Sequence, residues 1–210
     1  MFDYVDTYIA GVKRVDAVIA ALSPTTLTYL DETGTDMDGV LGPGAPPDNN
    51  PRYWVAAAGS FAYMFARAAN ESSTVAQVGA SQLMDAPGQE PSVTLLDWSS
   101  GLGTARFWVV KLLLESIAPG DALVATAVAV ATPGADADAL FAVGVAVAGG
   151  GARRILLINK RNAWADVALA GARCASVKTI DEATRLGPAR DDDCAALRLA
   201  PYAVSVVTLA

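Results

Sequence analysis

The chain contains no histidine in its 210 residues. Catalysis by a Ser-His-Asp or Cys-His arrangement is therefore excluded, as is any zinc site with histidine ligands. The two cysteines, Cys174 and Cys194, are too few for a zinc site made of thiolates alone. They fit a disulfide in an oxidising compartment and two buried thiols equally well, so the sequence leaves their redox state open. Acid–base chemistry would have to come from Asp, Glu, Lys or Tyr.

Basic residues are also scarce, with 15 Lys and Arg against 22 Asp and Glu and a formal net charge of −7. Binding to a phosphate backbone needs clusters of Lys and Arg, so nucleic acid is not an expected partner. The most hydrophobic region, 121–151, is interrupted by Pro133, Gly134 and three aspartates. No apolar run therefore reaches the roughly 18 to 20 residues of a membrane span. Met1 is followed by neither a basic region nor an apolar core, so no signal peptide is visible.

The first 118 residues alternate between helical and strand-like patterns. Apolar side chains recur with a helical period in three segments, and two short β-branched runs lie between them. The expected order is helix, strand, helix, strand and helix, over residues 3–22, 25–32, 52–73, 73–84 and 104–120. This alternation is typical of parallel α/β structure.

The pattern changes near residue 121, where the hydrophobic period falls from 3.6 to 2. About six strand-length segments follow, separated by turn residues and without a helix, which indicates an antiparallel β-sandwich. The sequence therefore predicts two domains, with residues 1–118 in an α/β part and residues 119–210 in the β-sandwich.

The strand over residues 25–32 ends in two carboxylates, Asp31 and Glu32, before a loop rich in Gly, Pro and Asn. In (β/α)₈ barrels the catalytic groups lie at the carboxyl ends of the strands, so these acids are candidate catalytic residues. A solvated strand end is the alternative. Because side chains alternate along a strand, Asp31 should point away from Glu32, and a structural role is expected for it.

Four segments together resemble the C-terminal part of a clan A retaining glycoside hydrolase. YLDETG is similar to the strand that carries the nucleophile, and RYWVAAAGSFAYMFARAA with VAQVGASQL is similar to helix seven and strand eight. RFWVVKLLLESIAPGDALVAT resembles helix eight, and RRILLINKRNAWADVALAG with LRLAPYAVSVVTL resembles the sandwich strands. The likeness is closest to family 79, the heparanase and β-glucuronidase enzymes, with the xylosidase/iduronidase and arabinofuranosidase families as neighbours.

The resemblance implies a fold in which the C-terminal part of a (β/α)₈ barrel, from helix six to helix eight, is followed by an antiparallel β-sandwich. It also implies that Glu32 is the nucleophile of a site that hydrolyses O-glycosyl bonds with retention. Such a site needs a second carboxyl group about 5 Å away as acid/base, and in this clan that Glu follows an Asn on strand four. The only Asn-Glu pair, Asn70 with Glu71, follows Glu32 and is expected to be a solvated helix end. The chain is therefore expected to be a truncated form that is inactive, or nearly so, by itself.

Three further residues are candidates for substrate binding. Tyr29 and Gln82 fall near the carboxyl ends of the two strands, where an amide can bond a sugar hydroxyl. Trp98 lies in a loop after the second strand, and an exposed indole can stack on a sugar ring. Core packing for Tyr29 and a buried loop anchor for Trp98 are the alternatives.

The expected partner is an oligo- or polysaccharide, and no cofactor or metal is expected, because the acids at 181, 182 and 191–193 fit no calcium-loop spacing. Self-association through open barrel edges is expected. The resemblance implies secretion or a lysosome-like vacuole. The alternative function is a non-catalytic carbohydrate-binding or interaction module, in which the β-sandwich is the working part.

Overall fold

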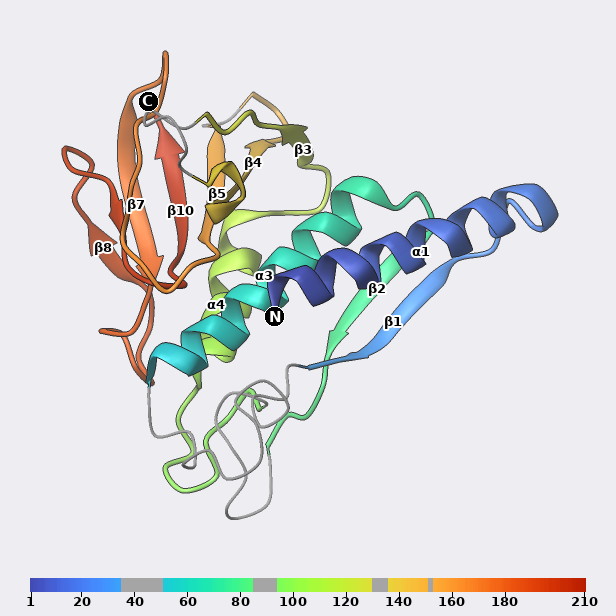
Figure 1. Cartoon of the computed structure of the whole chain (residues 1–210), viewed down its shortest axis with the longest axis horizontal. Coiled ribbons are helices and arrows are strands. Elements are labelled where there is room, and N and C mark those ends of the chain that lie inside the picture. Colours follow the sequence, from blue (N-terminus) through green and yellow to red (C-terminus); the bar gives the residue numbers. More distant parts are fainter. Residues whose placement is uncertain (35–50, 85–93, 130–135, 151–152) are drawn as a thin grey trace.

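The computed structural model of the chain describes residues 1–34, 51–84, 94–129, 136–150 and 153–210 (Figure 1). The first elements are α1 (Phe2–Leu22), β1 (Thr28–Thr33), α3 (Pro51–Glu71), β2 (Val75–Ala80) and α4 (Ala105–Ser116). The following elements are β3 (Ala122–Ala125), the short 3-10 helix η1 (Ala137–Ala139), β4 (Leu140–Ala146), β5 (Arg154–Asn159), β6 (Ala165–Asp166), β7 (Cys174–Ile180), β8 (Arg190–Asp192), β9 (Arg198–Leu199) and β10 (Val204–Leu209). The predicted alternation of helix and strand, and the change to strands after it, are both observed.

Strands β1 and β2 pair in parallel, as the α/β pattern predicts. Their register shifts between Leu30 and Thr33, just before the end of β1. At this irregularity the two backbones approach so closely that a Cβ on Gly79 would lie 2.6 Å from the carbonyl oxygen of Asp31. Only glycine leaves room for that approach. Within the residues that the structure describes, the sheet has these two strands.

The second sheet is antiparallel and has the strand order β3-β4-β5-β10-β7-β8. Side chains alternate between its two faces, as the period of two requires. Leu156, Ile158 and Val204 point to the helices, whereas Leu157 and Val207 point to the other face. That other face is covered by the two-stranded sheet β6-β9. The described layers are therefore unequal, six strands against two, and differ in this from a sandwich of two comparable sheets.

Helix α3 lies between α1, α4 and the six-stranded sheet (Figure 1). Its Gly59 permits close packing, because a Cβ there would lie 3.1 Å from the carbonyl oxygen of Tyr202, next to β10. Helix α4 packs on β7 and β10, and the indole Nε1 of its Trp108 donates a hydrogen bond of 3.0 Å to the carbonyl oxygen of Leu186. One hydrophobic core joins the three helices to the sheet and is continuous across residue 118.

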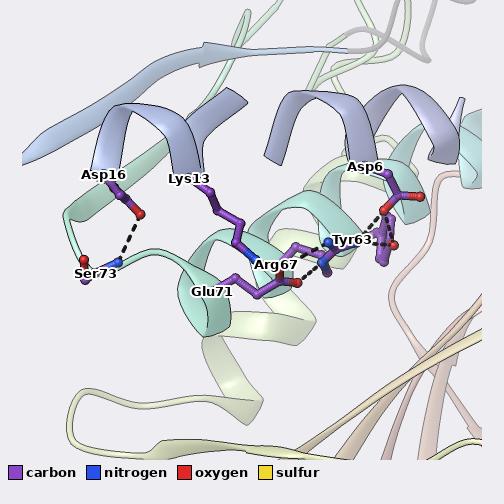
Figure 2. Close-up of polar contacts among 7 residues, drawn as sticks. All are labelled: Asp6, Lys13, Asp16, Tyr63, Arg67, Glu71 and Ser73. Carbon is purple, nitrogen blue, oxygen red and sulfur yellow. Dashed lines mark hydrogen bonds and ion pairs between the residues drawn. The ribbon is translucent and has the colours of Figure 1, made fainter. Parts of the chain in front are cut away.

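Polar contacts join α1 to α3 and to the turn that follows it (Figure 2). Tyr63 donates a hydrogen bond of 2.5 Å to Asp6, and Arg67 bonds Asp6 and Glu71 as well. Burial and the neighbouring carboxylate of Asp6 raise the pKa of Tyr63 to about 12. Lys13 reaches Glu71 from α1 at 3.2 Å. The helix is therefore fixed to α3 by a chain of charged groups along its length.

The two cysteines form a disulfide, which the sequence left open. Cys174 begins β7, and Cys194 lies in the segment before β9, with 5.5 Å between their Cα atoms. The bond ties the six-stranded sheet to the segment that leads into the small sheet. None of the described helices is long and apolar enough to cross a membrane.

Candidate functional site

The carboxyl ends of β1 and β2 lie side by side because the two strands run in parallel. The hydroxyl of Ser81, directly after β2, donates a hydrogen bond of 3.1 Å to Oε1 of Glu32. The backbone N–H of Ser81 donates to the carbonyl oxygen of Thr33 at 2.8 Å, and the hydroxyl of Thr33 donates to the carbonyl oxygen of Gly79. These bonds hold the exposed Glu32 carboxylate at a fixed place on the sheet edge.

Glu32 lines a cavity of about 440 Å³. The wall comes from α1, from the end of β1 and from the middle of α3. The lining residues are Met1, Tyr4, Val5 and Tyr8 at the start of the chain, Glu32, Thr33 and Gly34 at the end of β1, and Ser60, Phe61 and Met64 in α3. A concave, largely apolar wall with a few convergent polar groups is typical of a small-molecule site.

Two tyrosines of α1 supply phenol groups to this wall, which the sequence analysis did not anticipate. Burial, followed by the charge of Asp31, raises the pKa of Tyr8 above its ordinary value. The Tyr8 phenol therefore stays protonated at neutral pH and can donate a hydrogen bond. The structural role expected for Asp31 stays a prediction.

A buried cation lies close to the same place. Arg106, in the first turn of α4, is only 1% exposed, and burial lowers its pKa to about 10. Its guanidinium carbon lies 6.0 Å from the centroid of the Phe61 ring, and its Nη1 lies 3.7 Å from where a Cβ on Gly34 would stand. The sequence pattern places Arg106 only in a helix, because nothing in a linear pattern shows that α4 directs this side chain to the end of β1.

The predicted substrate-binding residues are not gathered around Glu32. Tyr29 is 59% exposed on β1, opposite Gln77, and is not part of the described cavity wall. Gln82 follows Ser81 with a left-handed φ of 57°, and its carbonyl oxygen accepts a hydrogen bond of 3.2 Å from the N–H of Leu95. Ser81, its neighbour, is the residue that meets Glu32. The sequence feature that could have identified Ser81 is the same one that pointed to Gln82, namely a polar side chain where a strand ends.

Trp98 lies beyond the carboxyl end of β2, in a tight turn, and is 51% exposed. The carboxylate of Asp97 organises that turn by accepting hydrogen bonds from the hydroxyl of Ser99 at 2.8 Å and from the N–H of Ser100 at 2.9 Å. The indole is therefore not a buried loop anchor. Its exposure on a fixed turn leaves it available to stack on a ligand.

The Asn70-Glu71 pair lies at the amino-terminal end of the parallel strands, opposite to the end that carries Glu32. It ends α3, four residues before the first residue of β2, whereas Glu32 lies at the carboxyl end of β1. Glu71 is paired with Arg67 and Lys13, and burial of its carboxyl group is outweighed by these partners, so its pKa is lowered. It has a structural partner set and is remote from the cavity.

Three of the five acids after residue 180 form ion pairs. Asp181 bonds Arg190 at 2.5 Å, Asp192 bonds the same guanidinium at 3.2 Å, and Glu182 bonds Arg52 at 2.6 Å. Among the described residues, no group of three or more Cys, Asp or Glu side chains could hold a metal ion.

The combination of these parts defines a class of fold. Parallel strands covered by helices and joined to an antiparallel sheet are shared with solved structures of glycoside hydrolases. No protein-family model matches the chain, and no curated protein sequence matches it significantly. The likeness is therefore one of structure.

Two solved structures illustrate it. A conserved exported protein from Bacteroides fragilis superposes with a TM-score of 0.63 at 13% identity, over 97% of this chain and 43% of that one. The catalytic domain of a glycoside hydrolase family 30 xylanase C from Talaromyces cellulolyticus superposes with a TM-score of 0.55 at 12% identity, over 89% of this chain and 41% of that one. The chain thus spans less than half the length of these proteins. Family 30 lies in clan A, so the likeness agrees with the clan, and the resemblance to family 79 stays a prediction.

Proposed function

We propose that this chain forms the C-terminal part of a clan A glycoside hydrolase fold and that Glu32 stands in the place of the nucleophile. By this proposal residues 1–118 correspond to the barrel from helix six to helix eight, and residues 119–210 to the β-sandwich. The observation that carries the proposal is the Glu32 carboxylate itself. It ends a parallel strand, lines a cavity and is held by a hydroxyl from the next strand.

The chemistry follows from the geometry of a carboxylate with one hydroxyl donor. As nucleophile, Glu32 would form a bond to the anomeric carbon while the glycosidic bond breaks. The Ser81 hydroxyl would keep the attacking oxygen oriented, and the Tyr8 phenol would be available to donate to a substrate oxygen. Tyr29, Gln82 and Trp98 remain proposed contacts for more distant sugar units.

Protonation of the leaving group needs a second carboxyl group, and we assign none within the described residues. Glu71 lies at the opposite end of the parallel strands from Glu32 and is paired with Lys13 and Arg67. Residues 1–210 alone are therefore proposed to lack turnover on ordinary glycosides. The names of the structural neighbours, a xylanase and, at 17% identity and a TM-score of 0.50, a bifunctional glucanase-xylanase, make xylose- and glucose-based polysaccharides the substrate class to test first. The disulfide and the exported neighbour favour a secreted protein.

A substrate with a leaving group that departs without a proton tests the nucleophile separately from the acid. In a 2-deoxy-2-fluoro-β-xylosyl or β-glucosyl fluoride, the carboxylate oxygen bonds to the anomeric carbon while the C–F bond breaks and fluoride takes the electron pair. The expected result is a covalent sugar adduct on Glu32, detected by mass spectrometry of the intact chain and its peptides. Glu32→Gln should remove the adduct, whereas Asp31→Asn should keep it.

Three outcomes contradict the proposal. They are no adduct after long incubation with either fluoride, an adduct on another carboxylate, and equal labelling of Glu32→Gln. Aryl glucuronide, xyloside, arabinoside and glucoside should show no Glu32-dependent hydrolysis. Turnover of any of them that is lost in Glu32→Gln would disprove the proposed inactivity and require an acid/base group close to Glu32.

A further inference from the structure

The small sheet β6-β9 carries an exposed tryptophan far along the chain from the Glu32 cavity. Trp164 directly precedes β6 and is 56% exposed. In this sheet Asp166 is paired with Arg198, and Ala165 with the fully buried Leu199. Because side chains alternate, Trp164, Asp166 and Arg198 share the outward face while Ala165 and Leu199 point into the core.

The three outward side chains contact one another through Arg198. The guanidinium carbon of Arg198 lies 4.9 Å from the centroid of the Trp164 ring, within the range of a cation–π contact. Nε of Arg198 is 3.3 Å from the carboxylate of Asp166. The guanidinium therefore lies over one face of the indole and orients it, with the Asp166 carboxylate beside the cation, and the indole stays more than half exposed.

The backbone beneath the ring is fixed by a buried amide. Asn159, at the end of β5, is 1% exposed. Its Nδ2 donates to the carbonyl oxygens of Ala163 at 2.6 Å and Ala200 at 2.9 Å, and its Oδ1 accepts from the N–H of Arg161 at 3.1 Å. One side chain thus ties the segment before Trp164 to the end of β9. The disulfide of Cys194 holds the segment that leads into β9.

We propose that this face, formed by Trp164, Asp166 and Arg198, is a binding site for a neutral polysaccharide, separate from the Glu32 cavity. A pyranose with equatorial hydroxyls, such as xylose or glucose, has an apolar C–H face that can stack on the exposed part of the indole, and hydroxyls that can bond the neighbouring Asp166 and Arg198. Binding to a rigid aromatic side chain loses little conformational entropy. The two strands under this face have two residues each. A standard protein interface buries about 800 Å² per partner, which needs a much larger surface. A sugar chain therefore fits this face better than a protein does.

Affinity electrophoresis of the full chain tests the proposal, with soluble arabinoxylan and mixed-linkage β-glucan in the gel as probes. The native chain should be retarded by at least one of them. Trp164→Ala should weaken the retardation constant by about tenfold or more, since it removes the central aromatic group. Trp164→Phe should keep most of it. Leu114→Ala is the control, because it removes an exposed apolar side chain of α4 that belongs to neither site, and it should change nothing.

Tryptophan emission gives a second readout that does not depend on how well Trp164→Ala folds. Xylohexaose or cellohexaose should shift the emission of the native chain to the blue, and the shift should disappear in Trp164→Phe. The proposal is overturned if neither polysaccharide retards the native chain. It is also overturned if Trp164→Phe keeps the emission shift, or if Trp164→Ala is retarded by both polysaccharides as strongly as the native chain.

Discussion

The disulfide gives a prediction whose magnitude follows from the chain itself. It joins Cys174 and Cys194 across a separation of 20 residues. In the loop-entropy description, closing a loop of this size removes about 3 kcal/mol of conformational freedom from the unfolded chain. The double variant Cys174→Ser with Cys194→Ser should therefore lose about 3 kcal/mol of unfolding free energy. With a denaturant slope of about 2 kcal/mol per molar urea, the midpoint should fall by roughly 1.5 M.

Urea unfolding followed by circular dichroism measures the loss, and reduction supplies the control. Dithiothreitol should lower the midpoint of the native chain to that of the double variant and leave the double variant unchanged. Thiol titration of the unreduced, unfolded chain should find no free thiol. Two reactive thiols, or midpoints that agree within about 0.3 M with and without the bond, would refute the reasoning, since the loop constraint would then be missing from the unfolded state.

Three further predictions concern the half of the chain that carries Glu32. The buried carboxylate of Asp16 accepts hydrogen bonds from the turn after α3, including one from the hydroxyl of Thr74. Asp16→Ala should therefore lower the free energy of unfolding in urea by about 2 kcal/mol. Asp3→Ala, on the exposed side of α1, should lower it by almost nothing. Burial opposes the charge of Asp16, but the hydrogen bonds outweigh burial and lower the pKa of this carboxyl group. The stability that Asp16 contributes should therefore be complete above about pH 4 and lost as the pH falls through the lowered pKa. If the unfolding free energies of Asp16→Ala and of the native chain change in parallel below pH 4, this prediction is wrong. Gly79→Ala should destabilise the chain by about 2 kcal/mol or more, and an unchanged melting temperature would show that β1 and β2 do not approach as described. Tyr29 lies exposed on a two-stranded sheet, so Tyr29→Lys should reduce concentration-dependent self-association in sedimentation velocity, whereas identical sedimentation of both proteins at all concentrations would exclude β1 as the contact.

Local sequence patterns were enough to locate the helices, most of the longer strands and the position of Glu32. The helical period of residues 3–22, the β-branched run before Asp31 and the change to a period of two near residue 121 each reflect interactions within one element. A carboxylate at the end of a strand is likewise a local property. The brief strands β6, β8 and β9 are shorter than any periodic pattern, so their pairing could not be anticipated from the sequence.

The surroundings of Glu32 depend on contacts between distant segments. Ser81 meets Glu32 across 49 residues because β1 and β2 pair in parallel, and that register is set by the close approach at Gly79. Tyr8 and Arg106 reach the same place from α1 and α4, which are close in space only because both pack on α3. No linear signal encodes these distances.

By itself the sequence determined the order of the elements, the lack of histidine chemistry, and a carboxylate at the end of a parallel strand. Each of these depends on residue identity and on periodicity within about ten residues. The tertiary structure alone decided that the cysteines pair, that Ser81 rather than Gln82 holds Glu32, and that Trp164 stands on a rigid outward face. These outcomes depend on how hydrophobic surfaces from separate elements are buried together, which fixes distances between residues that the linear pattern leaves independent.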